Sequence, residues 1–210
     1  MRDPLGRLLP GLPRGVRVVL DWVLTIAGAV LIVLAIKTWI VNPYRIPSSS
    51  MEPTLHCAAP AAGCLAHYSD RVLANRFIYR FRDPRRGEII VFRTPPLAAV
   101  KCGEGGTFVK RLIGLPGERV REDHDGFIWI QPPATGDWFR LKEPYVSSNA
   151  RLTDTSHYGQ TWRVPEGSYF FLGDNRGQSC DSREWGAVPR KDLIGEVFFV
   201  YWPPNRIGFR

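Results

Sequence analysis

The sequence predicts a mainly β protein, an antiparallel β-sheet domain that follows one N-terminal transmembrane helix. Two observations carry this prediction: a long apolar run near the N-terminus and, after it, short apolar runs separated by turn-forming residues. With 210 residues and 44% hydrophobic content, the chain can bury one core but not two large domains. We expect a tail at residues 1–17, an anchor helix at 18–41 and a β-rich domain at 42–210.

The apolar run at residues 18–41 has the length and composition of a membrane anchor. Between Asp21 and Lys37 every residue is apolar or small except Thr25, and a helix of this length crosses about 30 Å of hydrocarbon. A cleaved signal peptide would need a small-x-small site just after the run, and a buried core helix is normally shorter and has a polar face. The run is not followed by such a cleavage site, and it is neither short nor polar on one face, so we expect an anchor.

Charge predicts the orientation of this anchor. The N-terminal end of the chain carries four arginines, Arg2, Arg7, Arg14 and Arg17. Positive residues favour the cytoplasmic side, so we expect a cytoplasmic tail and an exported domain. The net charge of +8 is scattered along the chain. A scattered charge suits an anionic bilayer surface better than nucleic acid, which would favour a basic stripe.

After the anchor, the sequence has the pattern of short strands separated by turns. Short apolar runs lie at residues 88–92, 107–113, 127–130, 169–172 and 196–202. Glycine and proline punctuate them, which predicts short, largely antiparallel strands. The stretch at about 124–165 is polar and rich in turn formers. We interpret it as a smaller excursion from the core and assign it no chemistry.

The four cysteines fit an oxidising compartment. Cys57 and Cys64 bracket a short loop that a disulfide could close, and Cys102 and Cys180 form a second pair if the fold brings them together. Zinc is the alternative for the first pair, with the ligand set His56, Cys57, Cys64 and His67. Their spacing matches no ordinary zinc finger, so a disulfide is preferred.

A serine-rich segment follows the anchor, Pro-Ser-Ser-Ser-Met-Glu-Pro-Thr-Leu at residues 47–55. Its prolines bias the chain toward extended geometry, in which Ser48 and Ser50 point to one side and Ser49 to the other. One hydroxyl could attack a carbonyl carbon while the second, with a backbone N–H, stabilises the oxyanion. Taken alone, such a segment is more often a linker.

A serine nucleophile needs a base, and residues 107–113 offer one. Their alternation places Lys110 and Arg111 on opposite faces of a strand. Desolvation lowers the pKa of a lysine held among apolar groups, whereas an arginine stays charged, so Lys110 is the candidate. The alternative is a pair of edge-strand cations that prevent aggregation.

A dense run of turn formers and charges occupies residues 173–183. Within it, Ser179 could orient a neutral lysine, and Asp181 could pair with Arg183 to brace the loop. The alternative is an ordinary β-turn followed by a surface ion pair.

Together these segments resemble the ordered motifs of the bacterial type I signal peptidase family. The resemblance rests on Pro-Ser-x-Ser-Met-x-Pro-Thr-Leu, Val-Lys-Arg-x-x-Gly-Leu-Pro-Gly and Gly-Asp-Asn-Arg-x-x-Ser-x-Asp-Ser-Arg, in this order. Arg-Gly-Glu-Ile-Ile-Val-Phe at 86–92 resembles a fourth motif, and the family also has an N-terminal anchor. The likeness spans residues 42–208 and weakens through 124–165. Ser49 departs from it, because the family most often has glycine there.

The resemblance implies an antiparallel β-sheet catalytic domain and a Ser/Lys peptidase. Ser50 would be the nucleophile and Lys110 the general base, with an oxyanion hole made by the Ser48 hydroxyl and the Ser50 N–H. Ser179 would hold the lysine. The implied structural support comes from Arg111, Asp174, Asp181 and Arg183.

The resemblance also implies the reaction and its setting. The family cleaves signal peptides from exported preproteins after small residues, usually with alanine at the first and third positions before the cut, and needs no metal or cofactor. We expect a single-pass protein of the bacterial plasma membrane with its catalytic domain outside the cytoplasm. Transient contact with the secretion machinery would fit this role, and nucleic acid would not.

Two other functions compete with this interpretation. A histidine-based serine hydrolase could draw on His56, His67, His124 or His157, but the chain lacks a Gly-x-Ser-x-Gly elbow. A membrane-tethered β domain without activity is the second alternative. Relatives that process pilin or organelle precursors would have nearly the same sequence pattern, so the substrate set stays open.

Overall fold

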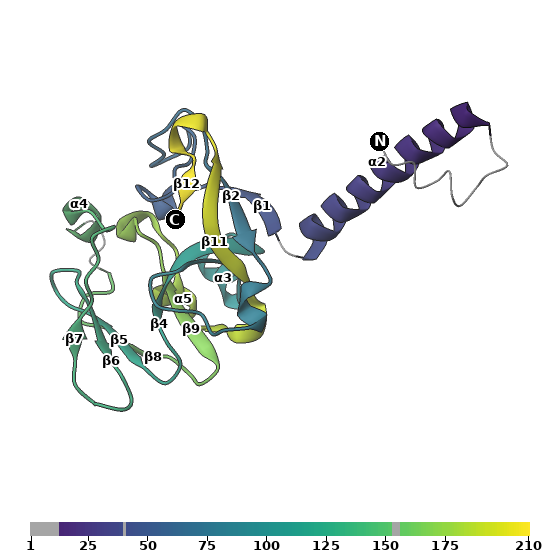
Figure 1. The fold of residues 1–210 in the computed structure, drawn as a ribbon. Helices are drawn as coiled ribbons and strands as arrows, with labels where there is room; N and C mark the ends of the chain where they lie inside the picture. The colour runs from purple at the N-terminus through teal and green to yellow at the C-terminus, as the bar shows by residue number, and fades with distance from the viewer. Residues whose placement is uncertain (1–12, 40, 153–155) are drawn as a thin grey trace. The chain divides into compact units, whose positions relative to one another are not determined.

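The computed structural model describes residues 13–39, 41–152 and 156–210. The chain divides into two compact units, Met1–Val41 and Asn42–Arg210. Figure 1 shows one long helix in the first unit and the strands of two sheets in the second.

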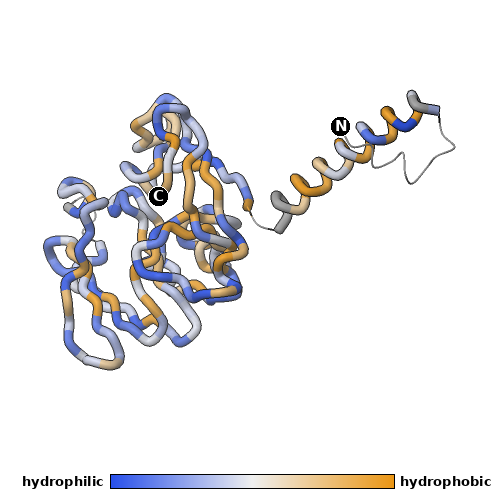
Figure 2. Tube along the Cα trace, viewed as in Figure 1, coloured by the Kyte–Doolittle hydropathy of each residue, from blue (hydrophilic) through white to orange (hydrophobic). Residues whose placement is uncertain are grey.

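Helix α2, Arg14–Trp39, is the long helix of the first unit. Its residues Gly15–Ala35 are long and apolar enough to cross a membrane, and the side chains described in this stretch are mostly exposed. Figure 2 shows hydrophobic colours along most of its length, with polar residues near its N-terminal end. The helix begins four residues before the predicted anchor. It ends before Val41, because Pro43 disfavours helical geometry at the preceding residue.

The larger sheet has eight strands and forms the body of the second unit. Its path runs β1-β2-β11-β3-β4-β9-β10, and β12 pairs with β11. The bounds are β1 Val41–Arg45, β2 Arg71–Asn75, β3 Ile89–Arg93, β4 Thr107–Gly114, β9 Ser168–Leu172, β10 Val188–Pro189, β11 Leu193–Trp202 and β12 Gly208–Phe209. The pairings from β2 to β10 are antiparallel, so the predicted mainly β, antiparallel fold is confirmed.

The smaller sheet is antiparallel and has the order β7-β6-β5-β8. Its strands are β5 Arg119–Glu122, β6 Ile128–Gln131, β7 Phe139–Arg140 and β8 Thr161–Arg163. One face packs Val120, Ile128 and Ile130 against Ile113 of β4 and Phe170 of β9, so it rests on one end of the larger sheet (Figure 1). Three of the four strands lie within the stretch at 124–165 that we interpreted as an excursion; β5 precedes it.

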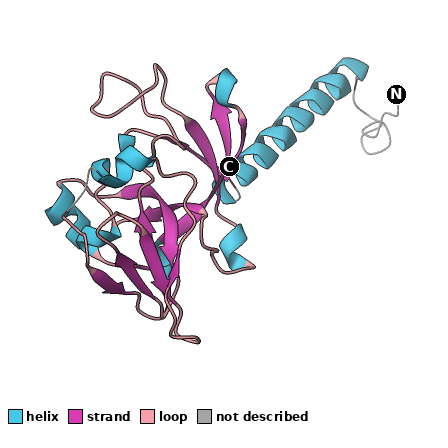
Figure 3. Ribbon diagram, turned by 90° about the vertical axis from the view of Figure 1, so that its left-hand side faces the viewer, coloured by secondary structure: helices cyan, strands magenta, loops and turns pink. Residues whose placement is uncertain are grey.

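Short helices occupy the connections between strands, as Figure 3 shows. The α-helical ones are α3 Pro96–Cys102, α4 Ser148–Leu152 and α5 Ser182–Trp185. The 3-10 turns are η1 Ser49–Met51, η2 Ile78–Arg80, η3 Arg176–Gln178, η4 Arg190–Asp192 and η5 Pro204–Arg206. Of these, η1 and η3 lie in two of the motif segments identified from the sequence.

The core anchors the serine segment on the larger sheet. Met51 and Leu55 are 1% and 0% exposed and pack with Ile46, Val72 and Val91. Burying a large apolar side chain contributes roughly 1.5–3 kcal/mol. The residues on either side of Met51 are therefore held in place by burial on the sheet, rather than left as the linker considered above.

Candidate active site

Ser50 lies in the 3-10 turn η1 and is only 6% exposed. Its Oγ is 3.3 Å from the Ser48 Oγ, so the two hydroxyls share one side as predicted. The backbone there is not extended, which corrects the prediction: the Glu52 N–H donates to the Ser49 carbonyl at 3.0 Å and closes a turn. Ser49 points elsewhere, toward Gly63.

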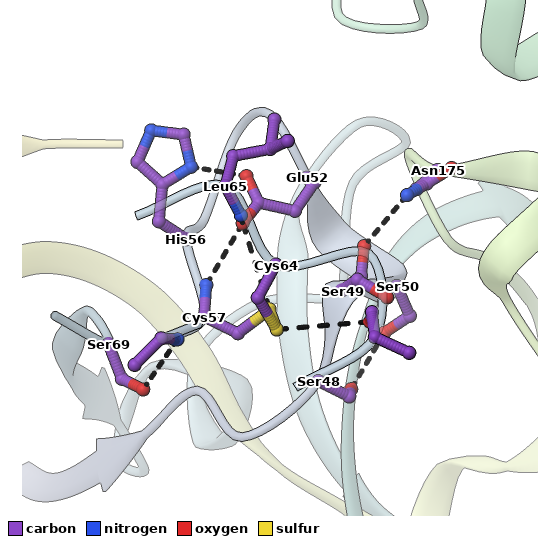
Figure 4. The surroundings of a disulfide bond; sticks show 12 residues. Ser48, Ser49, Ser50, Glu52, His56, Cys57, Cys64, Leu65, Ser69 and Asn175 are labelled. Carbon is purple, nitrogen blue, oxygen red and sulfur yellow. Dashed lines mark hydrogen bonds and ion pairs between the residues drawn. A yellow bond between two sulfur atoms is a disulfide. The ribbon is translucent and has the colours of Figure 1, made fainter. Parts of the chain in front are cut away.

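The motif at residues 173–183 holds the carbonyl groups of this turn. The Asn175 N–H donates to the Ser50 carbonyl at 3.1 Å, and the Asn175 side-chain amide donates to the Ser49 carbonyl at 3.2 Å (Figure 4). Gly173 also passes close by, where a Cβ would lie 2.5 Å from the Ser50 carbonyl oxygen and would collide with the Ser179 side chain. Only glycine fits this position without a shift. Neither Gly173 nor Asn175 was predicted to have a role of its own, although both belong to the turn-forming run at residues 173–183.

Lys110 is in the middle of β4, opposite Ile90 of β3, and is 4% exposed. Burial lowers its pKa to about 8, against the partial opposing effect of the Asp181 carboxylate. The nearby Arg183 guanidinium lowers this pKa further, and Asp174 and Glu104 raise it. A buried amine of this kind is neutral often enough near neutral pH to accept a proton.

One cavity of about 470 Å³ brings the predicted chemical groups together. Ser48, Ser50 and Lys110 all line it, together with other residues of strands β1 and β4 and the Cys102–Cys180 disulfide. In the described part of the chain, no hydrogen bond joins Lys110 Nζ to Ser50 Oγ. The base and the nucleophile therefore face one space without direct contact, an arrangement that often tightens only when substrate binds.

Ser179 does not contact Lys110 through the hydrogen bond that the sequence suggested. Its hydroxyl donates to Asp181 Oδ2 at 2.8 Å. Asp181 also accepts from the Gly173 N–H at 3.0 Å and from Arg183 Nε at 2.9 Å. Burial alone would raise the pKa of Asp181, but Arg183 and these hydrogen bonds hold it below its usual value. Any effect of Ser179 on Lys110 thus passes through the charged Asp181.

Arg111 faces away from Lys110, as the alternation predicted. It makes a bidentate pair with Asp174, from Nε at 2.8 Å and Nη2 at 2.6 Å, and its guanidinium stacks on Tyr145 at 3.8 Å. Thr54 donates to the same carboxylate at 2.5 Å. The pair therefore ties β4 to the segment that follows Ser50, which is a bracing geometry.

Two further buried ion pairs reach the site from the smaller sheet's side of the unit. Glu143 pairs with Arg176 of η3, and Glu122 Oε2 of β5 lies 3.4 Å from Arg183 Nη1. Burial raises the pKa of Glu122 despite these cations. Neither pair was predicted from the sequence. The two residues of each pair are 33 and 61 positions apart in the chain, and no local sequence pattern predicts a contact over such a separation.

The cysteines form the two disulfides considered from the sequence, Cys57–Cys64 and Cys102–Cys180, with Cα atoms 5.0 and 5.9 Å apart. The zinc alternative is wrong, because the Cys57 and Cys64 sulfurs are bonded to each other and the described residues contain no cluster of metal-binding side chains. Figure 4 shows His56 paired with the buried Glu52 instead.

A histidine base finds no support in the geometry. His56 is engaged with Glu52, His157 Nε2 lies 2.8 Å from Glu184, and none of the cavity-lining side chains is a histidine. Lys110 is the candidate base that lines the cavity with Ser50.

Comparison with known proteins agrees with these motifs. Residues 19–202 match the model of a family described as signal peptidase, peptidase S26. The chain is 38% identical to a probable signal peptidase I-2 of Synechocystis sp. over 88% of this chain and 73% of that protein. It is 34% identical to a signal peptidase I of Leptolyngbya laminosa, over 93% and 86% respectively. A crystal structure of a signal peptidase I from Enterococcus faecalis V583 is 34% identical, covers 55% of this chain and 97% of its own, and has a TM-score of 0.41.

Proposed function

Because the chain belongs to the signal peptidase family, peptidase S26, we propose that it removes signal peptides from exported preproteins with Ser50 as nucleophile and Lys110 as general base. One observation carries this proposal. A buried lysine, with a pKa near 8, lines the same cavity as a serine whose neighbouring hydroxyl is 3.3 Å away.

The reaction follows from these positions. Neutral Lys110 takes the proton of the Ser50 hydroxyl as Ser50 Oγ attacks the carbonyl carbon that precedes the scissile bond. The Ser48 hydroxyl and the Ser50 N–H donate to the oxyanion. Lys110 then gives its proton to the leaving amine, and a water that it deprotonates releases the signal peptide from Ser50. Ser179 and Asp181 act as positioning residues through the charge beside Lys110.

The strands beside the cavity suit an extended substrate. β1 is an edge strand of the larger sheet, and the first half of β4 pairs only with β3, because pairing with β9 begins at Arg111. Both strands contribute to the cavity wall. A signal peptide added here by backbone pairing would turn alternate side chains toward the cavity wall, to which Ile46 and Val109 contribute. Small residues at the first and third positions before the cut fit this alternation.

The setting of the reaction is also part of the proposal. The long apolar helix and the bacterial relatives fit a membrane protein. We infer that residues 1–17 lie in the cytoplasm, that 18–41 span the plasma membrane and that 42–210 act outside it, where both disulfides are stable. Added protease should then digest the second unit in spheroplasts but not in inverted vesicles. The opposite pattern would reverse the orientation.

Cleavage of a preprotein by the full chain in detergent tests the catalytic assignment. We expect wild type to cleave after an Ala-x-Ala sequence and Ser50→Ala and Lys110→Met to lose cleavage by more than about a thousandfold. Ser49→Ala and Lys101→Met are matched controls, because Ser49 points to Gly63 and Lys101 is exposed. Cleavage that survives Lys110→Met would overturn the lysine base and point back to a histidine.

A further inference from the structure

The outward face of the smaller sheet carries an unusual concentration of arginine. Antiparallel pairing puts directly opposed residues on the same face, and Val120 and Trp162 define the inward one. The opposite face presents Arg119, Arg121, Arg140, Arg163, Thr161, Trp129 and Gln131. We call this set the arginine face.

The arginine face contains a like-charge pair in register. Arg119 of β5 lies directly opposite Arg163 of β8, an arrangement that destabilises a sheet. The two line a surface hollow of about 410 Å³ together with Thr161 and Gly117. Glu166 lies beside Gly117, yet in the described chain it makes no ion pair with either arginine. No direct ion pair with Glu166 therefore relieves the repulsion within the described residues.

The neighbouring Arg121 forms no direct ion pair among the described residues, although the Asp123 carboxylate just beyond β5 is close enough for the Arg121 charge to lower its pKa. Its guanidinium stacks on Trp138 at 4.6 Å and lies 5.8 Å from Trp129, and its Nε is buried without a hydrogen bond. Stacking on a ring holds a guanidinium while leaving its N–H edge available for an anion. The nearest acceptor shown for Arg119 is a neutral one, Gln131 Oε1 at 3.4 Å.

We propose that the arginine face binds an acidic segment of a partner protein. Carboxylates placed between Arg119 and Arg163 would relieve their repulsion and form charge-assisted hydrogen bonds. β8 is the edge strand next to this pair, so an extended segment can pair with its backbone while alternate side chains reach the arginines. Arginine and tryptophan are also the residue types enriched at protein interfaces.

A protein segment fits this face better than a lipid surface does. Surfaces that dock stably on a membrane insert large apolar side chains in addition to attracting anionic lipid by their charge. Here the tryptophans are half-buried beneath guanidinium groups, and Phe139 is the large apolar residue of this sheet that is exposed, at 43%. The strongly exposed apolar side chains of the second unit, such as Leu65, Phe81 and Phe209, lie elsewhere.

Fluorescence anisotropy with a labelled alternating Asp-Glu peptide and the full chain in a zwitterionic detergent tests this proposal. We expect saturable binding that the Asn-Gln peptide of equal length lacks. The double variant Arg119→Gln/Arg163→Gln should bind roughly tenfold or more weakly. The same variant should melt at a higher temperature, because the like-charge pair is gone. A weaker peptide complex without loss of folding separates a binding role from a structural one.

The control variant Arg71→Gln/Arg93→Gln removes the same charge from exposed positions of the larger sheet. It should leave peptide binding unchanged. Equal weakening in the control would mean that bulk charge alone drives binding, and would overturn the proposal. So would an absence of peptide binding, competition by inorganic phosphate at equal charge, or a dependence on Arg119 and Arg163 seen only with phosphatidylglycerol vesicles. Cleavage activity is a separate readout, so failure here leaves the peptidase assignment intact.

Discussion

External pH should control catalysis through Lys110. With a pKa of about 8, its amine is neutral in roughly 9% of molecules at pH 7, 50% at pH 8 and 90% at pH 9. Only the neutral amine can accept the Ser50 proton, so kcat/KM should rise about tenfold between pH 7 and pH 9 and then level off. An unburied lysine would still be gaining activity at the upper end, and a histidine base would level off near pH 7.

The profile is best measured as kcat/KM for a peptide that spans a signal-peptide cleavage site and carries no group titrating near pH 8. Lys101→Met should reproduce the wild-type midpoint, since this lysine is exposed and does not line the cavity. A midpoint near that of histidine, or a profile flat through pH 8, would refute the reasoning. A midpoint above pH 10 would show that burial does not shift this lysine.

Three further outcomes follow from the same geometry. Lys110→Met should raise the free energy of unfolding at pH 7 by up to about 3 kcal/mol, because the buried amine is charged there. This gain should shrink between pH 8 and 10.5, where Lys110 is already neutral in the native protein but still charged in the unfolded chain. Chemical denaturation across that pH range measures the change. Gly173→Ala should abolish cleavage and lower the melting temperature, since its Cβ would press on the Ser50 carbonyl; Gly28→Ala, with open space around it, is the control, and an active Gly173 variant would contradict the contact. Glu104→Gln should move the pH midpoint of kcat/KM downward, because this carboxylate raises the pKa of Lys110, and an upward move would be inconsistent with that charge effect.

Local pattern was enough to predict most of the fold and the cavity-lining groups. Alternation in β4 separated Lys110 from Arg111, and the structure places them on opposite sides as expected. The strands and the apolar helix could also be predicted, because each depends on hydrophobic periodicity within a few residues. Ser48 and Ser50 were paired correctly, although by a turn rather than an extended segment.

The hydrogen-bond and ion-pair partners of the polar side chains around the site could not be predicted in the same way. Ser179 was expected to hold Lys110, but its hydroxyl has a nearer acceptor in Asp181, two residues along a turn. Glu143 and Arg176 form an ion pair although they are 33 residues apart, and the local sequence around neither residue predicts the other as its partner. The contact between Glu143 and Arg176 depends on how the smaller sheet packs on the larger one, which sequence spacing does not encode.

The buried cations explain why a lysine is the residue that titrates. Arg111, Arg176 and Arg183 each pair with a carboxylate, Asp174, Glu143 and Asp181 respectively, so their charge is compensated where it is buried. In the described chain, Lys110 Nζ has no carboxylate in direct contact. Asp181, the carboxylate that raises the Lys110 pKa most, already accepts a hydrogen bond from Arg183. Burial of an ion that lacks a partner favours its neutral form, whereas a paired ion stays charged. The arginine–carboxylate pairs thus fix the loops around the site and leave the charge of Lys110 only partly compensated, so that burial dominates and lowers its pKa.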